Sequence, residues 1–264
     1  MLTKRIIPYI EIDNGKLAVH SKSASDYVTE SPVELAKMLA EQSADEIAIF
    51  DCTAKPTAKS RRSFLKIITQ CARSLFIPVI AGLETQSISQ FAELLRAGAD
   101  KIVLGQCAVE NPGLITQASR EFGKQSVVVN VTAKRQSVYG QSVWDIPLND
   151  KSNSRMKTAV GWARQAYNLG AGELLISVLV KDRPRLDIQV IRTISHAVDI
   201  PVTAACGAES LQEIYEAFAI GGADASFTHT KLNSGKFTLY QIKSYLAKRG
   251  LPVRFSKVAQ LQGA

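Results

Sequence analysis

Three ionisable residues lie where the sequence could support acid–base chemistry. Glu11, Asp51 and Lys134 each stand at or just beyond the end of a short apolar run of the kind that forms buried strands. Parallel strands end at one edge of a sheet, so we expect the two carboxylates and the ammonium group to face the same mouth. Such a group could move protons on a substrate, or it could be an ion-pair network that only stabilises the mouth. The sequence leaves both interpretations open.

Cysteine and histidine residues offer a second candidate chemistry, but their positions argue against it. Cys52, Cys107, Cys206 and His229 all fall at or near predicted strand ends. Tetrahedral zinc needs ligands within about 2.0–2.3 Å, and these residues follow strands that are distant in chain order. The chain also contains no C-x-x-C pair, so we expect no metal, no cofactor and no disulfide framework. His229, followed by Lys231, is a better candidate for contact with an anion.

Eight short β-type apolar runs alternate with helical patterns along the chain. The runs occupy residues 6–12, 47–50, 78–81, 102–104, 127–131, 174–178, 201–205 and 223–228. Buried strands separated by helices are typical of a parallel sheet. Ser31 and Glu34 flank Pro32 in a capping-box pattern that predicts a helix start, and Asn111-Pro112 predicts another.

The second half of the sequence repeats positions of the first half. The recurring pairs are Pro78 and Pro201, Ser87 and Ser210, and Asp100 and Asp224, at separations of 123, 123 and 124 residues. An eightfold alternation in 264 residues with a half-length repeat predicts a single-domain (β/α)8 TIM barrel built from two half-barrels. An open doubly wound sheet is the alternative, but no glycine-rich dinucleotide fingerprint follows the first run.

Two long connections interrupt the regular alternation. Residues 16–30 follow the first run and are expected to form a lid, and residues 136–155 follow the fifth run and are expected to include a hairpin. Both connections are expected on the face where the strands end, which is where such barrels bind ligands. We expect the barrel to span residues 1–255 and a C-terminal tail to span residues 256–264.

Composition favours a globular protein with an anionic ligand. Hydrophobic residues make up 46% of the chain and charged residues 21%, and 32 Lys and Arg against 24 Asp and Glu give a net charge of +8. A positive field favours anionic small molecules, whereas specific nucleic-acid binding has no supporting module here. No apolar stretch of about 18 residues and no signal peptide is evident, so we expect a cytoplasmic protein without membrane contact.

Several motifs together resemble one known family. They are Lys4-Arg5-Ile6-Ile7-Pro8 and the segments 32–37, 44–46, 95–101, 133–135, 170–173 and 250–254. The pattern resembles that of the HisF family, the cyclase subunit of imidazole glycerol phosphate synthase in histidine biosynthesis. The resemblance implies a (β/α)8 barrel, a substrate with two phosphates, and a lyase reaction that uses ammonia from a glutaminase partner.

At the catalytic positions the chain departs from the family pattern. The resemblance implies two aspartates, at the ends of strands one and five, that act as general acid and base. The matching residues here are Glu11 and Thr132. Glu11 keeps the ionisable group but moves it by one methylene, whereas a threonine hydroxyl does not transfer protons near neutral pH. Asp51 and Lys134 remain as candidates to compensate.

The phosphate-binding turns that the resemblance implies are altered as well. After the third strand, Gly82 is followed by Leu83 and Glu84, which place a side chain and a negative charge where the family has glycines. After the seventh strand, Gly207 survives ahead of Ser210. The residues expected to bind a ligand are therefore Gly82, Gly207, Ser210, His229 and Lys231.

The opposite mouth of the barrel keeps the family pattern. The resemblance implies a ring of alternating charges that admits ammonia, and its members here are Arg5, Glu46, Lys101 and Glu173. Asp100, which lies beside the partner surface in relatives, is also retained. Removal of one member of a buried ring leaves the others unpaired, so a structural role and a surviving glutaminase-docking surface are both open.

Together these features predict a divergent HisF-like barrel whose ordinary cyclase activity is lost or altered. Such a pseudoenzyme would serve as a binding or assembly protein, or would act on another anionic small ligand. The alternative is an active cyclase subunit, with Glu11 as the principal acid–base group and ammonia supplied by a glutaminase partner.

Overall fold

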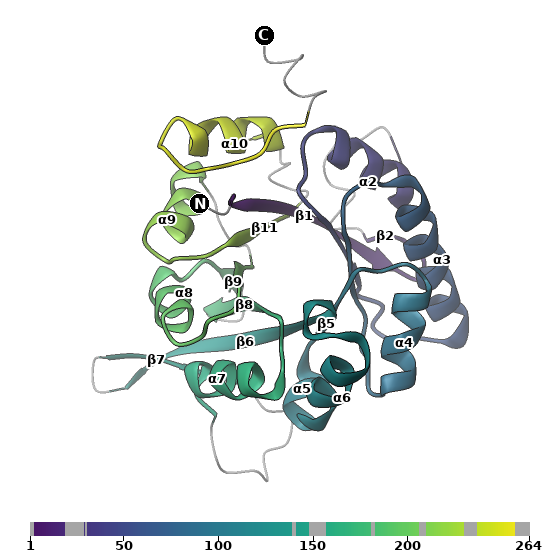
Figure 1. Ribbon diagram of the computed structural model, residues 1–264, viewed down its shortest axis with the longest axis horizontal. Coiled ribbons are helices and arrows are strands. Elements are labelled where there is room, and N and C mark those ends of the chain that lie inside the picture. Colours follow the sequence, from purple (N-terminus) through teal and green to yellow (C-terminus); the bar gives the residue numbers. More distant parts are fainter. Residues whose placement is uncertain are drawn as a thin grey trace. The chain divides into compact units, whose positions relative to one another are not determined.

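The chain divides into two compact units, drawn in Figure 1. Unit 1 is Met1–Val103 with Phe227–Ala264, and unit 2 is Leu104–Ser226. The computed structural model describes residues 3–18, 29, 31–138, 141–147, 157–180, 183–205, 210–229 and 237–256. Gly207 and Lys231, two of the expected ligand contacts, lie outside these ranges, as do most of the expected lid and tail.

Unit 1 contains parallel strands that pair in the order in which they follow in the chain. They are β1 (Arg5–Asp13), β3 (Ile47–Asp51), β4 (Val79–Gly82) and β5 (Lys101–Leu104). The short β2 (Lys16–Leu17) folds back antiparallel onto β1, and β11 (Ala225–His229) is the other neighbour of β1. The first four apolar runs of the sequence are therefore strands, as predicted.

The helices of unit 1 begin at recognisable capping residues. They are α2 (Pro32–Glu41), α3 (Ala58–Ser74), α4 (Ile88–Arg96) and α10 (Leu239–Ala247). Ser31 caps α2 by accepting a bond from the Glu34 amide, as the sequence predicts. The Glu34 carboxylate differs from the prediction, because it accepts a bond from the Thr29 hydroxyl at 2.7 Å instead of closing a reciprocal box. No helix of the described ranges is long and apolar enough to cross a membrane.

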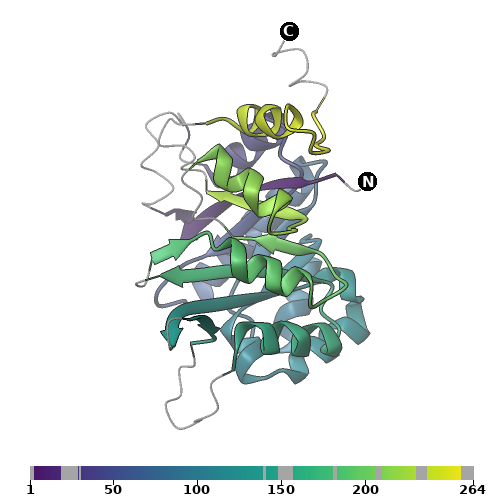
Figure 2. The ribbon, with the colours of Figure 1, turned by 90° about the vertical axis from the view of Figure 1, so that its left-hand side faces the viewer.

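Unit 2 combines parallel strands with two hairpins. Its parallel strands are β6 (Val127–Val138), β8 (Glu173–Val180) and β10 (Val202–Ala204), and β7 (Gln141–Asp145) and β9 (Arg183–Arg185) are antiparallel additions. Its helices are α5 (Gln106–Glu110), α6 (Gly113–Phe122), α7 (Ala159–Leu169), α8 (Ile188–Ser195) and α9 (Leu211–Ala219), with the 3-10 helix η1 (Lys124–Ser126). Figure 2 shows both hairpins at the carboxyl-terminal ends of β6 and β8.

The β6–β7 hairpin confirms the one expected within residues 136–155, and its base is anchored. The Trp144 indole donates a hydrogen bond to the Asp187 carboxylate at 2.9 Å, and Arg135 lies 3.6 Å from the same oxygen. Asp187 is 6% exposed and also caps α8 by accepting from the Gln189 amide. One buried carboxylate therefore ties the hairpin to the start of a helix.

The order of the strands settles the fold class. Parallel strands alternate with helices in both units, and in each unit strands that follow one another in the chain are neighbours in the sheet. A doubly wound sheet reverses its strand order at a switch point, and the described strands of the two units contain no such point. The protein therefore has the predicted (β/α)8 TIM-barrel fold, and the open-sheet alternative is wrong.

The alternation of side chains along β1 determines which residues share a face. Ile6, Ile10 and Ile12 are fully buried, whereas Tyr9 and Glu11 are half-buried. Successive side chains of a strand point to opposite faces, so Arg5, Tyr9 and Glu11 lie on one face of β1. Arg5 stands at its beginning and Glu11 near its end. This face therefore links the two ends of unit 1 at which the sequence predicts sites.

Residues that recur in the sequence make the same contacts in both units. Asp100 accepts a bond from the Val79 amide at 2.8 Å, and Asp224 accepts one from the Val202 amide at 3.1 Å. Ser87 and Ser210 likewise cap their helices by accepting from the amide three residues ahead. The recurring serines thus cap helices, and the recurring aspartates accept bonds from the first amide of a strand. These are local structural roles that do not require a ligand.

A buried charge cluster fastens the C-terminal segment to unit 1. Lys243 of α10 is 1% exposed, and its ammonium group lies 2.7 Å from Asp45 Oδ2 and donates to the Arg254 carbonyl. Asp45 also accepts from the Ile6 amide at 2.8 Å. Burial lowers the pKa of Lys243, and the attraction of Asp45 opposes that effect. These contacts hold residues 251–254 against the beginning of β1.

Candidate functional site

The end of unit 1 where β1 and β3 finish carries two of the predicted acid–base residues. Ile12 of β1 pairs with Asp51 of β3, and Glu11 pairs with Phe50, so the two carboxylates stand on adjacent strands. Asp51 Oδ1 accepts from the Thr53 amide at 3.0 Å. Asp51 Oδ2 is buried and has no hydrogen-bond partner among the described residues. Glu11 and Asp51 therefore lie at the same end of unit 1, but strand alternation places Asp51 on the face of Ile12, opposite the face of Glu11 and Phe50. Their joint role in acid–base chemistry stays a prediction.

Cys52 follows Asp51, and the pKa of its thiol depends on the charges around it. Its side chain is exposed, and its thiol donates to the Ile12 carbonyl at 3.2 Å. Partial burial and the negative charges of Glu11, Asp13 and Asp51 together raise the pKa of the Cys52 thiol. Such a thiol stays protonated near neutral pH and is a poor nucleophile. We therefore assign Cys52 no catalytic role.

Alkylation of Cys52 is expected to follow a thiolate titration with a midpoint above that of a free cysteine. Replacing Glu11 by Gln removes a negative neighbour, so the thiolate forms more readily and the midpoint moves to lower pH. The rate of iodoacetamide labelling at Cys52, followed by mass spectrometry across pH, measures the titration midpoint in the wild-type chain and in Glu11→Gln. Cys71 is buried, which raises the pKa of its thiol to about 12, so it serves as an unreactive internal control. An unchanged midpoint in Glu11→Gln would contradict this electrostatic assignment.

The second position at which the resemblance implies a catalytic aspartate lies in unit 2 and carries no ionisable group. Thr132 of β6 is half-buried and pairs with Ser177 of β8, whose hydroxyl donates to Asn130 at 2.9 Å. Lys134 stands two residues further along β6 and, by strand alternation, on the same face as Thr132. The side chains at this position and at its partner on β8 are thus both hydroxyls. Neither of these two side chains is the carboxylate that the resemblance implies.

Gly82, one of the expected ligand contacts, is packed against an aromatic ring. Phe50 and Gly82 are register partners on β3 and β4, and Gly82 is buried. A Cβ atom added at Gly82 would overlap Cδ1 and Cε1 of the Phe50 ring. The absence of a side chain at Gly82 is therefore required by the packing of Phe50. Packing against Phe50 is therefore enough to explain why a glycine stands here, and no bound phosphate is needed to account for it.

Replacing Gly82 by Ala is expected to destabilise the protein by about 1–3 kcal/mol, because the new methyl group must displace the Phe50 ring. Adding Phe50→Leu should relieve the overlap, so the double variant should lose less than the sum of the single losses. Urea unfolding of all four proteins measures this coupling. Gly113→Ala is the control, since the nearest atom to its new methyl group lies at 3.4 Å. Additive losses would contradict the contact.

The other predicted ligand contacts are a helix cap, the end of a strand, and two residues outside the described ranges. Ser210 caps α9 by accepting from the Glu213 amide at 3.2 Å. His229 is the last residue of β11. Gly207 and Lys231 are among the residues that the structure does not describe. The expected role of these residues in anion binding stays a prediction.

The described ranges contain no cluster of three or more His, Cys, Asp or Glu that could hold a metal ion. Cys107 is buried in α5, and Cys52 is exposed beside Asp51. Cys206 lies outside the described residues.

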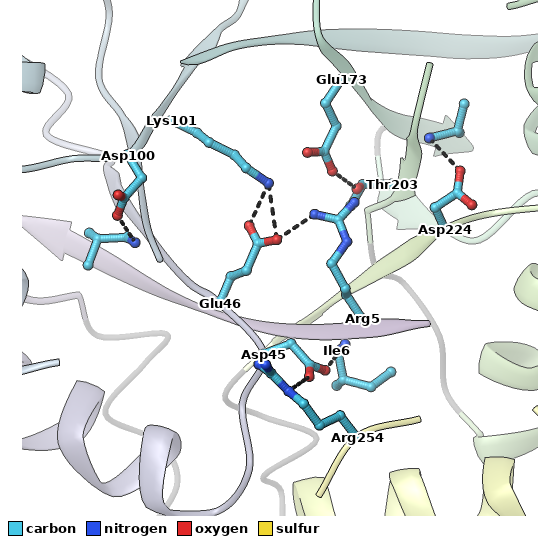
Figure 3. A network of polar contacts seen from close by, with 12 residues as sticks. Arg5, Ile6, Asp45, Glu46, Asp100, Lys101, Glu173, Thr203, Asp224 and Arg254 are labelled. Atoms are coloured by element: carbon cyan, nitrogen blue, oxygen red, sulfur yellow. Dashed lines mark hydrogen bonds and ion pairs between the residues drawn. The ribbon is translucent and has the colours of Figure 1, made fainter. Parts of the chain in front are cut away.

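At the opposite end of unit 1, three of the four predicted lower-mouth charges form one cluster, shown in Figure 3. Glu46 is 4% exposed and accepts hydrogen bonds from both Arg5 and Lys101, the latter at 2.8 Å. Glu173, the fourth residue, lies in unit 2, where it is 6% exposed and accepts a bond from the Thr203 hydroxyl. A carboxylate held by two cations at the start of three strands has an evident structural role.

Sequence reasoning missed an aromatic cluster in unit 1. Tyr9, Phe50 and Phe227 come from β1, β3 and β11, and their ring centroids lie 5.9–6.3 Å apart. Two signals could have found it: Tyr9 shares the strand face of Glu11, and Phe50 directly precedes Asp51. The cluster matters because Phe50 also covers Gly82.

The fold and the site define a (β/α)8 barrel with carboxylates at one mouth and a charged cluster at the other. The family model of the histidine biosynthesis proteins matches residues 5–237. The chain is 36% identical over 272 residues to imidazole glycerol phosphate synthase subunit HisF of Methanocaldococcus jannaschii, covering 96% of this chain and 99% of that protein. HisF subunits of Prochlorococcus marinus and Thermococcus onnurineus are 36% and 34% identical, over 96% and 97% of this chain and 98% and 100% of those proteins. The chain belongs to the HisF family.

Proposed function

We propose that this chain is a divergent HisF-family paralogue whose ordinary cyclase activity is lost or altered. It acts as a binding or assembly component, or on another anionic small ligand. One observation carries the proposal: the second proton-transfer position of the family is Thr132, and its register partner on β8 is another hydroxyl, Ser177.

The chemistry of ring closure needs a proton donor and a proton acceptor. Loss of a general acid or base typically lowers a rate by about 10²-fold to 10⁴-fold, and Thr132 cannot take either role near neutral pH. Glu11 keeps one ionisable group, but its carboxylate sits one methylene further from the backbone than an aspartate would. Displacements on the order of 1 Å can cost about another hundredfold.

An active cyclase remains the second candidate because of Asp51. Its Oδ2 atom is buried without a hydrogen-bond partner among the described residues, next to the strand that carries Glu11. An orphaned buried carboxylate oxygen is costly and is often kept for function. In this candidate Glu11 is the principal acid–base group, and Asp51 or Lys134 compensates for Thr132.

Complementation separates the two candidates. The proposal predicts that the chain, expressed in a histidine auxotroph that lacks its own HisF subunit, does not restore growth without histidine. A HisF subunit from one of the relatives is the positive control, and soluble expression of the chain is checked in the same cells. Growth that is restored by this chain and abolished by Glu11→Gln would support the active cyclase instead.

A glutaminase-type partner is proposed for the lower mouth, because Arg5, Glu46 and Lys101 persist there as one cluster. The relatives are named as subunits of a synthase, and this chain is proposed to keep that assembly surface. Co-purification with a candidate glutaminase from the same genome tests it, and separate elution of both chains at micromolar concentration would argue against it. We also propose a cytoplasmic location, since Cys52, Cys71 and Cys107 are free thiols that suit a reducing compartment.

A further inference from the structure

The turn that follows β4 is filled by its own side chains. Leu83 is 8% exposed, and Thr85 is fully buried with its hydroxyl donating to the Leu83 carbonyl at 2.8 Å. The Gln86 amide donates to Gln90 Oε1 at 2.8 Å, and the Gln90 amide donates to the Ser87 hydroxyl. Amide groups at the start of a helix commonly bind anions when they have no other partner. The Gln90 amide in the first turn of α4 and the Gln86 amide just ahead of the helix therefore already have partners from the same turn.

Phe50 closes the same turn from the side of the barrel strands. Its ring covers the Cα of Gly82 so closely that no side chain could be added there. The ring is held in place edge-on by Tyr9 at 6.0 Å and by Phe227 at 5.9 Å between centroids. Aromatic neighbours in this arrangement attract one another, so Phe50 is fixed over the glycine.

Charge at the turn adds to this steric effect. Glu84 is exposed and its carboxylate accepts a bond from the Gln86 side chain at 3.2 Å, which keeps it beside the start of α4. A carboxylate at this point repels a phosphate dianion and offsets the favourable field of the helix N-terminus. The β4–α4 turn is thus closed by packing, by internal hydrogen bonds and by charge.

We propose that Phe50 is a specificity-determining residue that, with Glu84, excludes phosphate from the β4–α4 turn. The ligand of this site therefore presents an uncharged group to this turn, and any anionic group that it carries is bound elsewhere. This inference deepens the proposed function and rests on it, because it names the class of ligand that the altered site accepts.

Amide chemical shifts of the turn test the exclusion directly. Inorganic phosphate titrated into the isotope-labelled wild-type chain should leave the amides of residues 82–90 unshifted. In the double variant Phe50→Leu, Glu84→Gly, the same amides should shift with an affinity at least about tenfold above wild type, the gain expected from one charge-assisted contact. Tyr9→Leu is the matched control, because it removes a ring of the cluster but leaves Phe50 and Glu84. It should stay as unresponsive as wild type.

Two results would overturn the inference. One is a saturable shift of these amides in the wild-type chain, and the other is a folded double variant that remains unresponsive to phosphate. The outcome is separate from that of the proposed function. Phosphate bound at the turn of a chain that fails to complement the auxotroph would refute the exclusion and leave the loss of cyclase activity standing.

Discussion

Replacement of Lys243 by Met is expected to lower the free energy of unfolding by about 3–5 kcal/mol. Lys243 and Asp45 are an ion pair with side chains only 1% and 6% exposed. Methionine has a similar volume, so packing changes little, but Asp45 loses the cation 2.7 Å away and remains a buried charge. The Arg254 carbonyl loses its donor as well, so the 251–254 segment should loosen first.

Two further variants isolate the cause of this loss. Lys243→Met combined with Asp45→Asn removes both charges, and its stability should lie closer to wild type than that of the single variant. Lys248→Met, at the exposed residue that follows α10, should change stability by no more than about 0.5 kcal/mol. Urea unfolding of the full chain measures all three. A single-variant loss below about 1 kcal/mol would contradict the role of the buried pair.

Replacement of Glu46 by Ala is the second change with a large expected effect, again a loss of about 3–5 kcal/mol. Glu46 is the shared acceptor for Arg5 and Lys101, whose side chains are 21% and 18% exposed. Without it, the two cations lose the buried carboxylate that they share, and their mutual repulsion in a partly buried position is no longer offset by it. Urea unfolding of the wild-type chain and of this variant measures the loss in the free energy of unfolding.

The control for Glu46→Ala is Glu93→Ala. Glu93 also pairs with an arginine, at 2.6 Å from Arg61, but its side chain is 42% exposed. Exposed pairs contribute little, so the expected loss is at most about 1 kcal/mol. Equal losses at the two positions would mean that burial does not set the energy of the Glu46 cluster. A large loss at Glu46 alone would show that the contribution of these charges to stability is enough to explain why the chain keeps them, whether or not a partner binds there.

The elements of the fold could be predicted because their signals are local. Short apolar runs gave the strands, and Ser31, Ser87 and Ser210 mark helix starts through bonds to amides three residues away. The recurring Asp100 and Asp224 each bond to a strand start. The β8–β9 hairpin was missed, because β9 is only three residues long and contains Pro184.

The candidate site was less predictable because its decisive contacts join distant residues. The sequence predicts Gly82 only as a ligand contact, and only the register of β3 against β4 shows that it accommodates Phe50. In the same way, Glu46 could be recognised as one of four retained charges, but its position as a shared acceptor for two cations depends on three strands coming together. Residue type indicated which positions matter, and tertiary packing determines what each one does.

A cyclase assay with ammonia as the nitrogen source tests the loss of proton-transfer chemistry most directly. The purified chain and the HisF subunit of Methanocaldococcus jannaschii are compared side by side with the substrate that the latter converts. Ammonia is supplied in solution, so no glutaminase is needed. With Thr132 at the second proton-transfer position, the chain should be slower by at least about 10²-fold. Turnover within about tenfold of the relative would contradict the account.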